Sequence, residues 1–428
     1  MYSATSSMPS DIDYLLSLSA VRDRAERVFQ TAEQDQLHHF VYHADRMPAV
    51  ASYVGDIIER DFGPDRYHEI PPHGRWQHFN VGDTDRISPL LANIDGDVAK
   101  TRVLIDLFWV SVLLDAGAGD TWLFTEPGSE KTYSRSEGLA VASLYMFQAG
   151  AFSSNAEVPL SVDGYALSKL TKESLATGLQ VSANNPVVGL ESRLQLLRDV
   201  GASLLQAKAA GVPNARPSDL LDILLNAAPS PAPLDYAVMW DTLQKLLIPA
   251  WPKTRTHIRG HPIGDAWPLA VLQDSTSDTG NIQPFHKLTQ WLGYSLTVPF
   301  VRILGREWTN TQLGTGLPEY RNGGLFVDMG VLELKPSTLQ AAQAASGQDL
   351  PLLDATGDAI VEWRAMTVAL LDRLHVLISK RFAEKGIAIT MAQMLEAGSW
   401  KAGREIAARL RPSTKSSPIL IDGDGTIF

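Results

Sequence analysis

The sequence contains no cysteine among its 428 residues. Disulfide bonds, thiolate zinc sites and cysteine nucleophiles are therefore excluded, and the absence fits a reducing compartment. The chain also lacks a long apolar run, because the longest one, residues 107–114, contains Ser111 and is too short to span a bilayer. The first ten residues, MYSATSSMPS, are polar. We therefore expect no signal peptide, no membrane association and a cytoplasmic location.

Basic clusters are missing as well, and the formal net charge is −11. A protein that binds nucleic acid usually presents a basic face that neutralises phosphates. We therefore expect a small-molecule substrate and no nucleic-acid partner. The sequence has no Walker motif, no GxGxxG after a strand and no GxSxG, so no cofactor is expected. The oligomeric state stays open.

Apolar residues recur at helical spacing along most of the chain, and extended alternating strands are not seen. Helices are expected over residues 98–114, 164–177, 236–247, 285–304, 359–385 and 391–410, and helical spacing continues through His39 and Phe40. The predicted fold class is mainly α with few short strands. Residues 1–9 are expected to form a disordered tail and residues 10–428 a single large helical domain. A two-lobed arrangement would place the break at residues 227–233, AAPSPAP.

Residues 317–330, LPEYRNGGLFVDMG, place four different polar groups side by side. They are the carboxylate of Glu319, the ring of Tyr320, the guanidinium of Arg321 and the amide of Asn322. Two glycines follow, so the backbone can turn tightly or approach a ligand closely. A charged turn that caps a helix would explain the same residues, and the local sequence leaves both interpretations open.

Two helical segments carry further candidates. Lys287, Trp291 and Tyr294 fall at i, i+4 and i+7, which puts an amine and two aromatic rings on one helix face. An exposed surface lysine is the simpler interpretation. Glu362 and Arg364 flank an apolar helical stripe, where solvated flanking residues are the simpler interpretation.

Two other groups have structural explanations. Ser134 and Glu137 have the spacing of a capping box at the start of a helix. Four residues near the N-terminus suggest a metal site: His38, His39, His43 and Asp45. His39 and His43 are separated by four positions, but no HExxH motif or further ligand cluster accompanies them.

Together these stretches resemble the uracil catabolism protein 4 family. The matching stretches are residues 74–79, 106–119 with Trp122, 134–143, 181–193, 284–295, 316–332, 361–372 and 422–428. They run over nearly the full length. The resemblance implies a role in a pathway that breaks uracil down to urea and a three-carbon acid, with ribosylurea as a proposed intermediate.

A more distant resemblance is to the queuosine salvage family, which hydrolyses the N-glycosidic bond of queuosine 5′-phosphate on an all-helical fold related to DNA glycosylases. Its motifs FYKRAQ, ADYRLPQ and VEIRGCS have ordered counterparts here in FHKLTQ, PEYRNGG and VEWRAMT, and residues 106–109 and 132–139 match two upstream motifs. The resemblance implies a helical DNA-glycosylase-like fold. This chain departs from the pattern in having Glu319 in place of an aspartate and Asn322-Gly323-Gly324 in place of Leu-Pro-Gln.

The chemistry of such a reaction fits these residues. Breaking a ribosyl C–N bond builds positive charge on the sugar, which a buried carboxylate can stabilise while it activates water. Glu319 is the candidate for this role. Lys287 would hold Glu319 ionised, bind the leaving group or sugar, or attack the sugar carbon as in related DNA glycosylases. The remaining candidate substrate-binding residues are Tyr320, Arg321, Asn322, Phe108, Trp109, Arg135, Glu137, Trp291, Glu362, Arg364 and Arg75.

The leading hypothesis is therefore an N-glycosidase that converts N-ribosylurea, or its 5′-phosphate, into urea and ribose or ribose phosphate. Arg75, Arg135, Arg321 and Arg364 are equally good candidates for binding a phosphate. A metal-dependent amidohydrolase or ureidohydrolase that acts on a ring-opened pyrimidine at the N-terminal histidines is one alternative. A non-catalytic scaffold for another enzyme of the pathway is the other.

Overall fold

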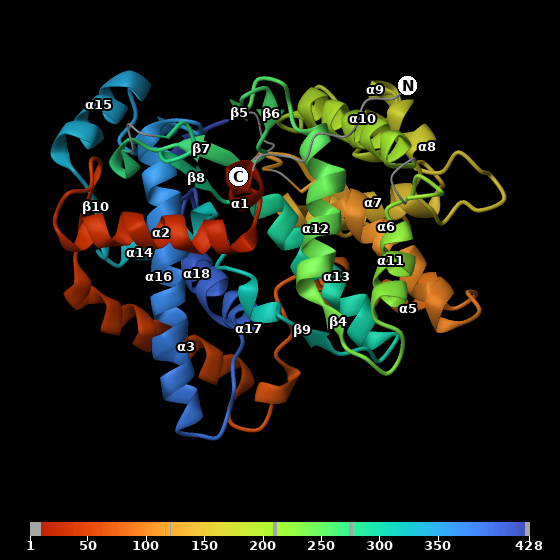
Figure 1. Ribbon diagram of the computed structural model, residues 1–428, viewed down its shortest axis with the longest axis horizontal. Helices are drawn as coiled ribbons and strands as arrows, with labels where there is room; N and C mark the ends of the chain where they lie inside the picture. The colour runs from red at the N-terminus through yellow and green to blue at the C-terminus, as the bar shows by residue number, and fades with distance from the viewer. Residues whose placement is uncertain (1–9, 116, 120, 209–211, 274–276, 424–428) are drawn as a thin grey trace. The chain divides into compact units, whose positions relative to one another are not determined.

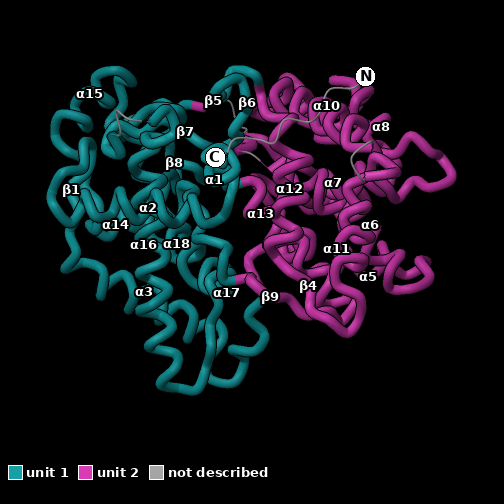
Figure 2. The backbone as a smooth tube through the Cα atoms, viewed as in Figure 1, with its two compact units in different colours: residues 1–71, 253–287, 312–422 teal, residues 72–252, 288–311, 423–428 magenta. Residues whose placement is uncertain are grey.

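The structure is a computed structural model that describes residues 10–115, 117–119, 121–208, 212–273 and 277–423. The expected disordered tail at residues 1–9 lies outside these described residues. The chain divides into two compact units, each built from segments that are distant in sequence (Figure 2). Unit 1 comprises Met1–Pro71, Lys253–Lys287 and Gln312–Asp422, and unit 2 comprises Pro72–Pro252, Leu288–Thr311 and Gly423–Phe428.

Unit 1 consists of helices with short paired strands between them (Figure 1). Its helices are α1 (Ser10–Leu15), α2 (Leu18–Glu33), α3 (Met47–Phe62), α14 (Tyr320–Asp328), α15 (Pro336–Ser346), α16 (Asp358–Ala383), α17 (Met391–Met394) and α18 (Trp400–Leu410). Its strands are β1 (Phe40–Tyr42), β5 (His257–Ile258), β6 (His261–Pro262), β7 (Ala266–Pro268), β8 (Ile282–Pro284), β10 (Leu332–Leu334), β11 (Leu352–Asp354) and β12 (Leu420–Asp422).

The 26-residue helix α16 is central to the packing of unit 1. Its residues from Ala359 to Leu371 are all buried, so this half of the helix is surrounded by protein on every side. It packs against α2, α3 and α14, and Figure 1 shows α2 crossing it. The strands form two-stranded pairs: β1 with β10, β5 with β6 and β7 with β8 run antiparallel, and β11 with β12 runs parallel. The paired strands lie in the segments between or after the helices.

Unit 2 is also mainly helical. Its helices are α4 (Arg75–Phe79), α5 (Ile87–Leu91), α6 (Asp97–Leu113), α7 (Arg135–Gln148), α8 (Gly164–Ser168), α9 (Lys172–Gly178), α10 (Leu190–Ala207), α11 (Asp219–Ala227) and α12 (Tyr236–Leu247). Its strands are β2 (Leu123–Thr125), β3 (Thr132–Ser134), β4 (Leu234–Asp235) and β9 (Trp308–Thr309), with β2 and β3 antiparallel and β4 and β9 parallel. Helix α13 (Lys287–Arg302) begins with the last residue of the second segment of unit 1 and continues in unit 2.

The prediction of a mainly α fold with few short strands is confirmed. The predicted helices at residues 98–114, 236–247 and 359–385 correspond to α6, α12 and α16. The single helix predicted at residues 164–177 is wrong, because the Thr171 side chain caps a new helix, α9, and separates it from α8. The helical spacing through His39 and Phe40 is also misleading, since α2 ends at Glu33 and β1 begins at Phe40.

The structure also bears on two expectations, the break between two lobes and the lack of a membrane-spanning segment. Residues 227–233 connect α11 to β4 inside unit 2, so they mark no boundary between the two units. Across the described ranges, no helix combines the length and apolar character that crossing a membrane would require.

Candidate functional site

Glu319 caps helix α14 with its side chain. One carboxylate oxygen, Oε2, accepts the backbone N–H of Arg321 at 2.8 Å, and the other, Oε1, accepts that of Asn322 at 2.6 Å. The capping interpretation of the LPEYRNGG stretch is therefore confirmed. Glutamate is not among the residues favoured at this position, which are Asn, Asp, Ser and Thr. A cap alone therefore does not explain why a longer acidic side chain stands here.

Opposing effects act on the pKa of the Glu319 carboxyl group. Burial raises the pKa of Glu319 above its ordinary value, whereas the two backbone N–H groups and the charges of Lys287 and Arg321 act to lower it. The residue nevertheless remains partly exposed to solvent. Such a carboxylate is fixed in place by its two N–H donors and its pKa is shifted by its surroundings, a combination that is common at functional sites.

Lys287 is the first residue of α13 and is also partly exposed. Its positive charge acts on Glu319, so the structure brings together the two predicted catalytic residues. The preceding residue, His286, is buried and has a φ of 47°, in the left-handed region that residues other than glycine rarely adopt. Its Nε2 lies 2.8 Å from the carbonyl oxygen of Leu15, which holds the strained residue in place.

Asp265 is a residue of this site that sequence reasoning missed. It is 1% exposed and its carboxylate oxygens each accept one N–H of Arg364 at 2.8 Å. Oδ1 also accepts Trp267 Nε1–H at 2.8 Å, and Oδ2 accepts the backbone N–H of Lys287 at 3.0 Å. Burial acts to raise the pKa of Asp265, but Arg364 and the other donors outweigh it and hold this pKa far below the usual range.

A signal for Asp265 was present in the sequence. The residue stands between Ile263 and the pair Ala266-Trp267, and a carboxylate inside such an apolar stretch is costly unless it is paired. The partner, Arg364, lies 99 positions away in the chain, so no local pattern connects the two. Arg364 therefore forms an internal ion pair in unit 1, and its guanidinium also lies over the ring of Phe285.

The side chain of Asn322 is bound inside the protein. Its Nδ2 donates to the carbonyl oxygen of Leu317 at 3.1 Å, and its Oδ1 accepts the hydroxyl of Ser399 at 2.8 Å. Ser399 ends a π-helical segment, Leu395–Ser399, between α17 and α18. The contact connects this segment to the start of α14 and thereby supports the turn that carries Glu319.

The two glycines of the same stretch serve helix packing. A Cβ on Gly323 would lie 2.8 Å from Trp363 Cε2 and 2.9 Å from Thr367 Oγ1, both on α16. Trp363 Nε1 also donates to the Gly323 carbonyl oxygen at 3.2 Å. A Cβ on Gly324 would lie 3.0 Å from Pro418 Cδ. The close approach that the glycines permit is therefore to other parts of unit 1.

Glu362 is fully buried and holds the segment before β1. Its carboxylate accepts the backbone N–H groups of His38 and His39 at 2.8 Å and of Phe40 at 3.1 Å. Burial raises the pKa of Glu362, and the N–H groups of His38 and His39 act to lower it. Both oxygens are thus engaged within unit 1, which favours a structural role over the predicted contact with substrate.

His38 and His39 lie near the same carboxylate, Asp358, whereas His43 lies near another one. His39 Nε2 lies 3.1 Å from Asp358 Oδ2 and His39 Nδ1 lies 3.1 Å from Thr338 Oγ1, whereas His43 Nε2 lies 3.2 Å from a carboxylate oxygen of Glu333. Both ring nitrogens of His39 are therefore engaged. Within the described ranges, no three His, Asp or Glu side chains are grouped so that they could hold a metal ion. The donor set that the amidohydrolase alternative needs is not assembled by these residues.

The remaining predicted residues belong to unit 2. Arg75 is fully buried: its Nε donates to Ser111 Oγ at 2.7 Å, and its Nη1 lies 3.1 Å from Asp115 Oδ1. Its Cζ lies 5.3 Å from the ring centroid of Trp291, within the range of a cation–π contact. Burial lowers the pKa of Arg75, while Asp115 and Glu137 act to raise it. Arg75 therefore stabilises the interior of unit 2.

The aromatic candidates of unit 2 are buried too. Phe108 and Trp109 are fully buried on α6, and Phe108 packs against Trp76 and Phe79 with ring centroids 5.9 and 5.3 Å apart. Trp291 is 8% exposed. All three rings are buried in unit 2, Trp291 beside Arg75, and their predicted contact with substrate stays a prediction.

Arg135 and Glu137 stand in the first turn of α7 and are both half-buried. Ser134 occupies the N-cap position, but its side chain makes no capping hydrogen bond, so the predicted capping box is wrong. The reason is conformational, because Arg135 has a φ of 54° and the helix starts from a left-handed residue. Of the four arginines considered for phosphate binding, Arg135 keeps the most solvent access, since Arg75, Arg321 and Arg364 are buried.

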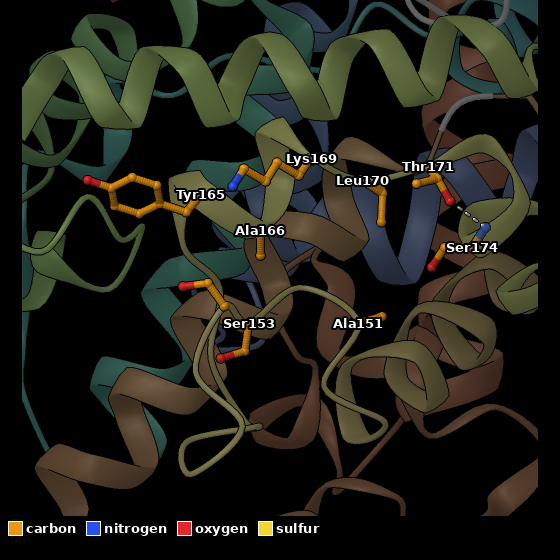
Figure 3. Close-up of a pocket in the computed structure, with 9 residues that line it drawn as sticks. Ala151, Ser153, Tyr165, Ala166, Lys169, Leu170, Thr171 and Ser174 are labelled. Atoms are coloured by element: carbon orange, nitrogen blue, oxygen red, sulfur yellow. Dashed lines mark hydrogen bonds between the residues drawn. The ribbon is translucent and has the colours of Figure 1, made fainter.

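A surface cavity of about 320 Å³ lies elsewhere in unit 2 (Figure 3). Tyr165, Lys169 and Ser153 are among the residues that line it, and Thr171 Oγ1 accepts the N–H of Ser174 at its edge at 3.1 Å. It contains none of the predicted site residues, so we do not assign the candidate site to it.

The fold and the site together define a mainly α protein in which the carboxylate of a partly exposed glutamate caps a helix and is acted on by the charge of a lysine. A family described as "Protein of unknown function (DUF1688)" matches residues 14–428. The chain is 47% identical over 420 residues to "Protein urg3" of Schizosaccharomyces pombe, covering 97% of this chain and 98% of that protein. It is 42% identical over 439 residues to "Uracil catabolism protein 4" of Lachancea kluyveri, covering 97% and 99%. The chain therefore belongs to this family of unknown function, and the predicted relationship to uracil catabolism protein 4 is confirmed.

Proposed function

We propose that this protein is a hydrolase of uracil catabolism that cleaves the N-glycosidic bond of N-ribosylurea or its 5′-phosphate. The products are urea and ribose or ribose 5-phosphate. The near full-length similarity to a protein named for uracil catabolism supports the pathway. The observation that carries the reaction is the placement of Glu319, a partly exposed residue whose carboxylate is held by two backbone N–H groups and acted on by the charge of Lys287.

The proposed reaction adds one water across the ribosyl C–N bond. As this bond lengthens, positive charge develops on the sugar, and the Glu319 carboxylate stabilises it electrostatically. A carboxylate offers about four acceptor positions, of which the two backbone N–H groups occupy two. The two remaining acceptor positions can take up a proton from the attacking water. The oxygen of this water forms the new bond to the sugar carbon. The urea nitrogen takes up a proton and leaves as urea.

Lys287 supports this role as a charge partner. Because the carboxylate must be ionised to act as a base, a neighbouring positive charge that favours the ionised form offsets part of the effect of burial. The backbone N–H groups at the start of α14 act in the same direction, as does the positive end of the helix dipole.

The direct test is to incubate the purified protein with N-ribosylurea and, separately, with its 5′-phosphate. Released urea is measured with a urease-coupled assay, and the sugar product by NMR. We expect stoichiometric urea and ribose or ribose 5-phosphate. Glu319→Asn should lower turnover by about 10²–10⁴-fold, and the control Glu333→Gln should not, because Glu333 has a side chain that is 70% exposed on β10. Absence of turnover with both compounds would contradict the proposal and favour a scaffold role.

A further inference from the structure

Two residues that need not touch the substrate connect the backbones of the two candidate catalytic residues. Asp265 accepts the backbone N–H of Lys287 at 3.0 Å. Arg364 binds the same carboxylate through both Nη atoms at 2.8 Å. The Nε of Arg364 then reaches the carbonyl oxygen of Pro318, the residue before Glu319, in a long contact of 3.5 Å. These contacts form one chain from Lys287 to Glu319.

The start of α13 depends on Asp265 in a second way. The backbone carbonyl oxygen of Asp265 accepts the N–H groups of Phe285 and His286 at 2.8 and 3.1 Å. Asp265 thereby holds three consecutive N–H groups, with its carbonyl binding two and its carboxylate the third. His286 has a positive φ, a conformation that persists only where the surroundings enforce it. The position of Lys287 is therefore set by Asp265 and does not follow from helix propensity.

The Arg364 guanidinium is fixed from another direction. It lies 3.9 Å from the centroid of the Phe285 ring, and its residue is 2% exposed. The bidentate pair is buried and close to neutral as a unit, so it can position its neighbours without adding a net charge beside Glu319.

We infer that Asp265 and Arg364 form a positioning pair that holds Lys287 in register with Glu319. The inference rests on the proposed function, because it assigns the pair a task in the chemistry of that site. Neither residue is a catalytic residue in this assignment. Both act through Lys287, whose positive charge favours the ionised form of the Glu319 carboxylate against the effect of burial.

The test uses the conservative variant Arg364→Lys. Lysine keeps a charge partner for Asp265, but it loses the planar bidentate contact and the reach to Pro318. We expect kcat to fall about 10- to 100-fold with KM nearly unchanged, since misplacement of a catalytic group by about 1 Å has effects of this size. Lys287→Met should lower kcat at least as much, and the double variant should be no slower than Lys287→Met alone. Additive losses would show that Arg364 does not act through Lys287 and would overturn the inference.

A matched control is available at the opposite end of α14 from Glu319. Arg411 makes a comparable bidentate pair with Asp328, the last residue of α14, through bonds of 2.8 and 2.5 Å. Arg411→Lys should leave kcat and its pH profile unchanged. An equal loss in this variant would indicate a general effect on α14 and would also overturn the inference. If Arg364→Lys fails to fold, Asp265→Glu provides the same comparison with the ion pair retained.

A second measurement separates this inference from the proposed function. The Glu319 carboxyl carbon can be followed by NMR in protein labelled at glutamate, with its signal identified by its loss in Glu319→Asn. Arg364→Lys should shift the titration of Glu319 to higher pH, in the direction of Lys287→Met. A protein that turns over neither ribosylurea compound but shows this shift refutes the proposed function and keeps the positioning pair. An unchanged titration refutes the positioning pair.

Discussion

Replacing Glu319 with asparagine separates its capping role from its proposed chemical role. Asparagine is among the best N-cap residues: its one amide oxygen can accept an N–H group of the first helical turn, but the side chain carries no charge and is one methylene shorter. Alanine removes the cap and the charge together. Aspartate keeps both and shortens the side chain by one methylene. The three variants therefore distinguish a residue that only caps α14 from one that also performs chemistry.

The expected stability changes follow from the geometry of α14. Loss of an N-cap costs about 0.5–2 kcal/mol, and Glu319 provides the acceptor for two N–H groups. The nine-residue helix also contains Gly323 and Gly324, each of which weakens a helix by about 0.5–1 kcal/mol relative to alanine. We therefore expect Glu319→Ala to cost about 2 kcal/mol, and Glu319→Asn and Glu319→Asp to stay within about 0.5 kcal/mol of the wild type.

The expected activities follow a different order. Removal of a general base or of an electrostatic stabiliser lowers the rate by about 10²–10⁴-fold, so Asn and Ala should both lose urea release to this extent. Aspartate should retain measurable turnover, because it keeps the charge. Thermal unfolding and the urease-coupled assay provide the two readouts. If Glu319→Asn releases urea at nearly the wild-type rate, the carboxylate is only a helix cap and the reasoning is refuted.

Three further predictions follow from the same region. First, kcat/KM should fall as the pH drops through a pKa above 4.5, because burial raises the pKa of Glu319 and only its ionised form acts as a base; an acid limb below pH 4.5 would argue against this. Second, Gly323→Ala should lower the free energy of unfolding by about 1–3 kcal/mol, since its Cβ would press on Trp363. Chemical denaturation should show a smaller loss for the less crowded Gly324→Ala, and equal losses would contradict the packing argument. Third, Glu362→Gln should cost about 2–4 kcal/mol, because an amide cannot accept all three N–H groups of residues 38–40. Faster proteolysis within residues 34–45 would accompany this loss, and unchanged thermal unfolding would exclude the role.

Local sequence patterns predicted the helices well where a single element buries one continuous face. Helix α12 matches its predicted bounds, and α16 differs from its prediction by one residue at the start and two at the end. Predictions failed where a short polar residue or an unusual backbone conformation decides where a helix starts. Thr171 starts a new helix inside an apparently continuous one, and the left-handed Arg135 prevents the capping box that Ser134 and Glu137 suggest.

The candidate site was predictable only in part. Glu319 and Lys287 were identified from their motifs, and the structure brings the charge of one to act on the other. The roles of Glu362 and Arg364 differ from the predicted ones, because their partners lie far along the chain. Glu362 binds the N–H groups of residues 38–40, and Arg364 binds Asp265. Such partners leave no local pattern in the sequence.

By itself, the sequence determined the helical class, the family and the order of the charged motifs, because these depend on the spacing of neighbouring residues. Only the tertiary structure decided which charged residues are fully buried and which stay partly exposed. It buries Arg75 and Arg364 against carboxylates, commits Glu362 to a backbone segment and leaves Glu319 and Lys287 partly exposed. The physical reason is that burial and pairing of a charged group depend on contacts between segments that are distant in sequence.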